Sequence, residues 1–228
     1  MTTPRFDSLD QMAAATAGML ADAAAHAAFR LFRDRTFRRL AAFDSLDQGE
    51  QDRIFNELVV SWLVLVMLML EAPDLGIDDD MRPYLGDVSK HIPKAHVGKL
   101  RELGIEDEHL RIWDKLIDMR YQEYARDRHG VRAAAMKIEA ADKELGANDF
   151  AKIQLCVPVQ AVAIGCHHHV CRGRTEGRDE LFKLLVRSLG RFYVEIRVRF
   201  EGGRITLLTR VRVALNRFFR RLLRHRWK

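Results

Sequence analysis

The sequence is poor in the residues that mark several classes of protein. It contains 5 prolines and 3 cysteines among 228 residues, and no low-complexity linker. This composition favours a folded chain over a disordered one, and an odd number of cysteines argues against a disulfide framework and fits a reducing cytoplasm. The N-terminus lacks the continuous apolar core of a secretory signal peptide. We therefore expect a folded cytoplasmic protein.

The motifs of the common enzyme and cofactor classes are also missing. The chain has no Gly-rich phosphate loop, no nucleophile elbow, no HExxH metalloprotease motif and no CxxCH haem-attachment motif. The sequence therefore favours a non-enzymatic protein, without deciding the matter.

Acidic residues are missing from one part of the chain, since none follows Glu201. Residues 172–228 carry 17 Lys and Arg against 5 Asp and Glu, whereas residues 1–171 carry 21 against 27. We call residues 172–228 the basic arm. A segment of this charge usually binds something anionic. The contrast predicts a helical domain over 1–171 and a basic C-terminal extension over 172–228.

The sequence contains one long, nearly uninterrupted apolar run. Residues 58–70 read LVVSWLVLVMLML, with Ser61 as their single polar residue and with Glu57 and Glu71 on either side. Thirteen residues fall short of the roughly 20 that span a bilayer, so the run predicts the buried central helix of a bundle. Contact of this helix with lipid stays open, and with it association with a membrane.

Periodic apolar residues and helix-start signals predict a mainly α-helical bundle around this helix. The hexapeptide Phe-Asp-Ser-Leu-Asp-Gln occurs at 6–11 and again at 43–48, and Ser8 and Ser45 are expected to cap the helices that follow. The expected helices cover residues 8–18, 20–41, 46–71, 79–90, 106–128, 130–145 and 148–170.

The basic arm is expected to have an αββα order. A short amphipathic helix over 178–189 ends at Gly190. From Phe192 to Phe200 apolar residues alternate with polar ones, and Gly202-Gly203 follows as a hairpin turn before a second alternating stretch over 204–213. The pattern therefore predicts a basic β-hairpin, with a last amphipathic helix over about 214–227.

Arginine outnumbers lysine in the arm by 15 to 2, and its planar fork suits phosphate groups. The expected partner is therefore nucleic acid or an anionic membrane surface; packing of the arm on the acidic domain, or pairing of protomers into a homo-oligomer through the hairpin, is the alternative. The candidate anion-binding residues are Arg197, Arg199, Arg204, Arg210, Arg212, Arg217, Arg220, Arg221 and Arg224. The candidate membrane-interface residues are Phe218, Phe219 and Trp227.

A second cluster of potential ligands lies at Cys166-His167-His168-His169-Val170-Cys171. Thiolates and imidazoles bind zinc and other transition metals, which makes Cys166, His167, His169 and Cys171 candidate metal ligands. The alternative is a hydrogen-bonded helix end with no metal.

Residues 7–135 also resemble a globin in the order and spacing of the expected helices. Phe43 follows the second helix, the apolar helix comes next, and His91 or His96 lies in a following short helix. The resemblance implies a haem cofactor, with His91 or His96 as the iron ligand and Phe43 against the porphyrin. A haem- or metal-binding helical sensor is therefore the alternative function.

Overall fold

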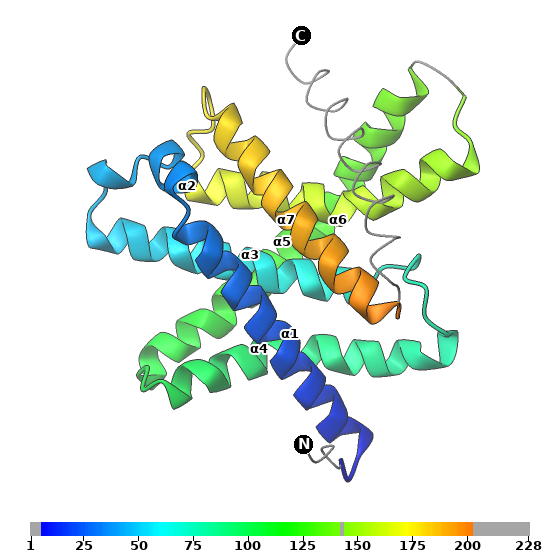
Figure 1. Ribbon diagram of the computed structural model, residues 1–228, viewed down its shortest axis with the longest axis horizontal. Coiled ribbons are helices and arrows are strands. Elements are labelled where there is room, and N and C mark those ends of the chain that lie inside the picture. The colour runs from blue at the N-terminus through cyan, green and yellow to red at the C-terminus, as the bar shows by residue number, and fades with distance from the viewer. Residues whose placement is uncertain (1–5, 142–143, 203–228) are drawn as a thin grey trace.

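In a computed structural model, residues 6–141 and 144–202 are described, and they form a helical bundle without strands (Figure 1). The predicted mainly α fold is confirmed for this part of the chain. The helices are α1 (Leu9–Phe32), α2 (Arg35–Leu40), α3 (Gln48–Leu70), α4 (Arg82–Glu102), α5 (Asp107–Ala140), α6 (Ala147–Val170) and α7 (Asp179–Phe200), with 3-10 turns at Phe43–Ser45 and Asp79–Met81.

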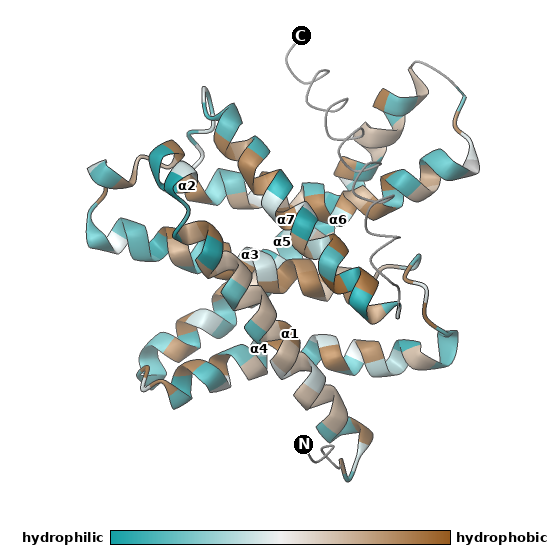
Figure 2. Cartoon of the chain, in the orientation of Figure 1, coloured by the Kyte–Doolittle hydropathy of each residue, from teal (hydrophilic) through white to brown (hydrophobic). Residues whose placement is uncertain are grey.

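The apolar run forms the core of the bundle, as predicted. All thirteen residues from Leu58 to Leu70 are buried on α3, which contacts α1, α4, α5, α6 and α7. Figure 2 shows the hydrophobic residues gathered toward the middle of the molecule and the hydrophilic ones toward its ends. Because residues 58–70 are apolar on nearly every side, they need neighbours all round, and the other long helices supply them.

Among the described residues, two helices, α3 and residues Asn148–Val170 of α6, are long and apolar enough to cross a membrane. The core helix of a soluble protein has the same length and composition, and most of both helices is buried inside this bundle. Their character is therefore weak evidence for a membrane location.

Three helices extend beyond the bounds that were predicted for them. α1 is one helix over 9–32, where two helices were predicted, because its buried alanines, such as Ala17, Ala21 and Ala24, keep one face against α3 and α4 across Gly18. α4 passes through Pro93 and α5 through Gly130. In each case packing of the helix face outweighs the local cost of Gly or Pro.

The two copies of the hexapeptide begin helices in different ways. Ser8 caps α1, since its side chain accepts a hydrogen bond from the Gln11 amide at 3.2 Å. The second predicted cap is wrong: Asp47 caps α3 by accepting from the Glu50 amide at 2.8 Å, and Ser45 donates to the Ala42 carbonyl. The same six-residue sequence therefore adopts a different local structure in each copy.

The first strand of the predicted hairpin is also wrong. Residues 192–200 are the second half of α7, which continues through Gly190 to Phe200. Leu185, Leu189, Phe192 and Ile196 are buried at helical spacing against the same core as α3 and α6. The rest of the hairpin, over 203–213, and the expected helix over 214–227 lie outside the described residues.

Candidate functional site

Arg197, a candidate anion-binding residue, is buried near the end of α7 and bound within the protein. Its Nε donates to Glu201 at 2.8 Å and its Nη1 to the Asp74 carboxylate at 2.9 Å, while its Nη2 donates to the Asp74 carbonyl. Its Nη1 also donates to the Tyr193 hydroxyl at 3.3 Å. These contacts bind α7 to the loop after α3, and they occupy the guanidinium that an external anion would need.

The second described candidate, Arg199, is exposed and donates to Glu195 one turn earlier at 2.8 Å. An exposed pair of this kind contributes little to stability, so Arg199 is accessible to an anion. The remaining anion-binding candidates (Arg204, Arg210, Arg212, Arg217, Arg220, Arg221 and Arg224) and the membrane-interface candidates (Phe218, Phe219 and Trp227) lie outside the described residues.

The four candidate metal ligands lie near the end of α6. Cys166 and Cys171 are buried, and burial raises the pKa of Cys166 to about 12 and also raises that of Cys171. The His167 ring is hydrogen-bonded to the Arg178 carbonyl at 3.1 Å, and His169 is bound to Glu123. Within residues 6–141 and 144–202, no three His, Cys, Asp or Glu side chains are grouped as a metal site.

The two candidate haem ligands lie on different sides of α4. His91 Nε2 is 2.8 Å from an Asp10 oxygen of α1, whereas His96 is buried edge-on against Trp113 of α5, with no hydrogen-bond partner for its Nε2. Phe43 packs against Phe32 and other core residues. These contacts give the haem prediction no specific support.

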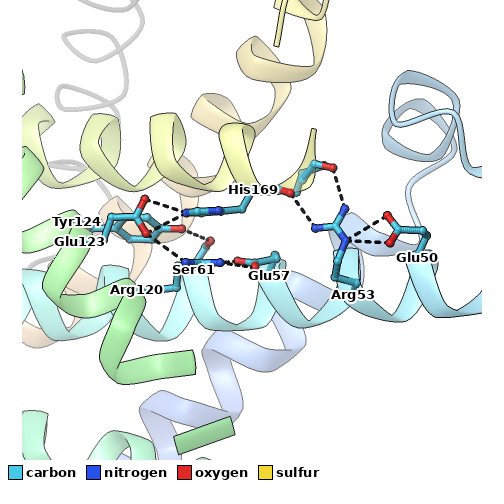
Figure 3. A network of polar contacts seen from close by, with 9 residues as sticks. Glu50, Arg53, Glu57, Ser61, Arg120, Glu123, Tyr124 and His169 are labelled. Atoms are coloured by element: carbon cyan, nitrogen blue, oxygen red, sulfur yellow. Dashed lines mark hydrogen bonds and ion pairs between the residues drawn. The ribbon is translucent and has the colours of Figure 1, made fainter. Parts of the chain in front are cut away.

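A polar arrangement joins α3, α5 and α6 (Figure 3). The sequence patterns singled out His169, as a candidate metal ligand, but did not connect it with the other residues. Glu57 of α3 and Arg120 of α5 form a two-pronged ion pair, with Nη2–Oε1 and Nε–Oε2 distances of 2.6 and 2.9 Å. Arg120 Nη1 also donates to Glu123 at 3.2 Å, and Glu123 holds the His169 Nε2 at 2.8 Å. We call Glu57, Arg120, Glu123 and His169 the charged network.

Burial and the neighbouring charges have opposite effects on the pKa of Arg120 in the charged network. Burial lowers the pKa of Arg120, but the hydrogen bonds and charge of Glu57 outweigh it, so the net pKa is raised. The guanidinium therefore stays charged, and the Glu57 side chain, only 7% exposed, has a permanent counter-ion. Such a pair fixes helix orientation more than it adds net stability.

An uncharged branch lies beside the charged network. Tyr124 of α5 is fully buried, and its hydroxyl is 3.4 Å from the Ser61 hydroxyl of α3. Burial holds the pKa of Tyr124 well above its ordinary value, so the phenol stays protonated. The ring fits only because residue 165 of α6 is glycine, since a Cβ there would lie 2.0 Å from the Tyr124 ring.

A third set of contacts fixes the end of α6. Arg53 of α3 donates from Nη1 to the His169 carbonyl at 2.8 Å and from Nη2 to the Val170 carbonyl at 3.2 Å. Helix ends leave carbonyls without partners inside the helix, and this arginine satisfies two of them. Glu50 orients Arg53 and also accepts from Arg172, the first residue of the basic arm.

The chemistry available at this site is that of a carboxylate-oriented imidazole beside a fixed guanidinium. The Tyr124 hydroxyl and the Cys166 thiol have raised pKa values and are held in the unreactive, protonated form. The arrangement is therefore suited to joining three helices, and we assign no nucleophile to it.

Comparison with known proteins identifies no relative: no family model, no curated protein and no solved structure matches this chain. The globin resemblance gains no support from these comparisons, and any function has to be inferred from the chain itself.

Proposed function

We propose that this chain is a non-enzymatic binding protein whose C-terminal segment docks on an anionic partner, nucleic acid or an acidic membrane surface. The observation that carries the proposal is the charge of residues 203–228, which hold nine basic and no acidic side chains. Since the whole chain carries +6, residues 1–202 carry −3. The acidic part of the chain is too weakly charged to neutralise the segment.

The use of charge within the bundle supports the same proposal. Glu57, Glu50 and Asp74 are bound to Arg120, Arg172 and Arg197. Acids already committed in this way are poor partners for a further nine cations. Arg172 and Arg197 are likewise occupied, so of the anion-binding candidates that the structure describes only Arg199 is left for the partner, and the rest of the proposed binding segment follows Gly202.

The test compares the full chain with a deletion of residues 204–228. We expect the full chain to bind double-stranded DNA, transfer RNA or vesicles with an anionic lipid, and the deletion to lose that binding while its circular dichroism stays helical. Equal binding by both proteins would refute the proposal. Vesicles of neutral phosphatidylcholine serve as the control for non-specific adsorption.

Two sets of substitutions distinguish the partners. Replacement of Arg217, Arg220 and Arg221 by Gln should weaken binding to either anion, because both rely on phosphate contacts. Replacement of Phe218 and Phe219 by Ser should weaken only vesicle binding, because insertion of an interfacial helix relies on apolar side chains. Binding to nucleic acid should fall steeply with added salt in the parent and in the Phe variant alike, whereas vesicle binding that relies on apolar insertion should persist at high salt.

The remaining possibility is that the acidic surface of the protein occupies the segment. The exposed run Asp78–Asp80 is the most concentrated described acidic patch that lies outside a long helix. If it competes for the arginines, Asp78→Asn combined with Asp80→Asn raises the affinity for external anions. An unchanged affinity leaves the segment free for its partner.

A further inference from the structure

A row of apolar side chains lies exposed on the first half of α5 and the turn before it. Ile105, Ile112 and Met119 are 39%, 58% and 56% exposed and are spaced by seven residues. Ile112 and Met119 are two helical turns apart on α5, so they lie on the same side about 10 Å apart, and Ile105 precedes them in the turn between α4 and α5. The turn between α4 and α5 lies at the lower left margin of Figure 1, away from α6 and α7.

The opposite side of this half of α5 is already used. Leu110 and Ile117 are buried against the bundle, and Trp113 packs against His96 of α4. The exposed row is therefore a second apolar face, and aligned apolar residues on an otherwise charged helix mark an interaction surface.

The charges beside the row indicate what covers it. Glu108 and Lys115 are exposed, lie along one edge of the row, and form no ion pair among the described residues. They are seven residues apart, about 10 Å along the helix, which is too far for a direct pair within one helix. Other exposed cations, such as Lys90 and Lys99, do pair with an acid one turn away.

We propose that this face binds the same face of a second copy of the chain in an antiparallel homodimer with Ile112 on the two-fold axis. A two-fold rotation about Ile112 brings each Met119 toward the turn that carries Ile105 in the other copy. It also brings each Glu108 level with the Lys115 of the other helix, on the same edge of the row. The surface is thus complementary to itself in both apolar residues and charge, as a two-fold interface requires.

The primary measurement is the molar mass of the full chain by sedimentation equilibrium from 1 to 200 µM, and we expect a monomer–dimer equilibrium with a dissociation constant on the order of micromolar, as is common for small interfaces. Ile112→Glu places two like charges at the axis and should weaken dimerisation by about 100-fold. Met19→Glu is the matched control, since Met19 is 67% exposed on α1 and should leave the dimer intact.

Charge exchange tests the register. Glu108→Lys and Lys115→Glu should each weaken the dimer by about tenfold, because each creates two like-charged contacts. The double variant restores the opposite charges and should recover the parental dissociation constant. Recovery requires contact between two helices, since the two positions do not meet within one.

Three results would overturn the proposal: a monomer at 200 µM, a dimer that survives Ile112→Glu, or a double variant as weak as the single ones. A dimer that is lost on deletion of residues 204–228 also contradicts it, because that result places the contact in the C-terminal segment. Circular dichroism of each variant separates loss of the dimer from loss of the fold.

Discussion

Gly165 is the position at which the structure predicts the sharpest response to a single methyl group. In an open helix position Gly→Ala stabilises by about 1 kcal/mol, because Ala has the higher helix propensity. At Gly165 the new Cβ would lie 2.0 Å from one Tyr124 ring carbon and 2.7 Å from another. Carbon atoms in contact stay about 3.5–4.0 Å apart, so the ring has to move by roughly 1.5 Å within a filled core.

Overpacking of this kind costs typically about 1–3 kcal/mol, and more where a buried ring cannot turn away. Tyr124 is fully buried and held by Ser61, so we expect Gly165→Ala to lower the free energy of unfolding by about 2–3 kcal/mol. For a chain of this length that corresponds to a fall in Tm of roughly 4–12 °C. Urea unfolding and thermal melts followed by circular dichroism measure both quantities.

Gly98→Ala is the matched control, since Gly98 lies in α4 with nothing within 4 Å of an added Cβ. It should stabilise the protein by up to about 1 kcal/mol. In the double variant Gly165→Ala with Tyr124→Ala, the methyl group at residue 165 should no longer cost stability. Equal melting temperatures for Gly165→Ala and Gly98→Ala would refute the close approach of α5 and α6.

Three further predictions concern charged and titratable groups. Arg120→Leu should lower the free energy of unfolding by about 3–5 kcal/mol, because the Glu57 carboxylate is left buried without a counter-ion, and adding Glu57→Leu should restore most of the loss in urea titrations. Burial lowers the pKa of His96 to about 4 from an ordinary 6.5, so the unfolded chain binds the proton more tightly. Stability should therefore fall by roughly 3 kcal/mol as the pH drops from 6.5 to 4, and His96→Leu should remove this fall from the melting curves. Arg197→Lys should increase amide hydrogen exchange at the end of α7, because one ammonium group cannot reach Glu201, Asp74 and Tyr193 together.

Each of these predictions has a contradicting result. A double Glu57 and Arg120 variant as unstable as Arg120→Leu would show that the buried charge is not the cause. A pH dependence that survives His96→Leu would assign the acid sensitivity to other groups. Unchanged exchange at the end of α7 in Arg197→Lys would mean that apolar packing alone holds this helix.

The parts of the fold that follow from local pattern could be predicted from the sequence. The run of residues 58–70 in α3, with Ser61 as its one polar residue, predicts the centre of a bundle, and the structure places it there. Gly104 ends α4 with a positive φ, and the acids after it begin α5, as their favourable interaction with free helix amides suggests. These signals lie within a few residues of the feature that they predict.

The predictions were wrong where one segment carried two local patterns, or where contacts with residues far away in the sequence determine the structure. Residues 192–200 alternate like a strand, but their apolar residues also recur at helical spacing, and packing on α3 and α6 selects the helix. The charged network could not be predicted, because Glu57 and Arg120 are 63 residues apart. Glu and Arg are also common on protein surfaces, so neither residue by itself indicates a buried ion pair. The acids beside the apolar run were visible in the sequence, but their partners were not.

Those two acids explain how a helix with no polar face is held in one position. Burial alone does not fix the rotation or the sliding of α3, because every side of the run is apolar. Glu57 and Glu71 lie 14 residues apart, about 21 Å along the helix, and both are bound by α5. Glu57 pairs with Arg120 of α5. Glu71 accepts hydrogen bonds from the hydroxyl of Tyr121, which follows Arg120 on α5, and from Arg128 Nη1 at 3.2 Å.

Adjacent residues of α5 therefore reach toward opposite ends of the apolar run, which is possible only if α5 crosses α3 between the two acids. Sliding α3 by one turn, about 5.4 Å, would break both contacts and would leave Glu57 as a buried charge without a partner. Such a displaced packing would keep most of the run among apolar side chains, so the loss of these two contacts adds to the cost of sliding. The charged residues at the ends of the run therefore help to set its position, together with close packing such as that of the Tyr124 ring against Gly165.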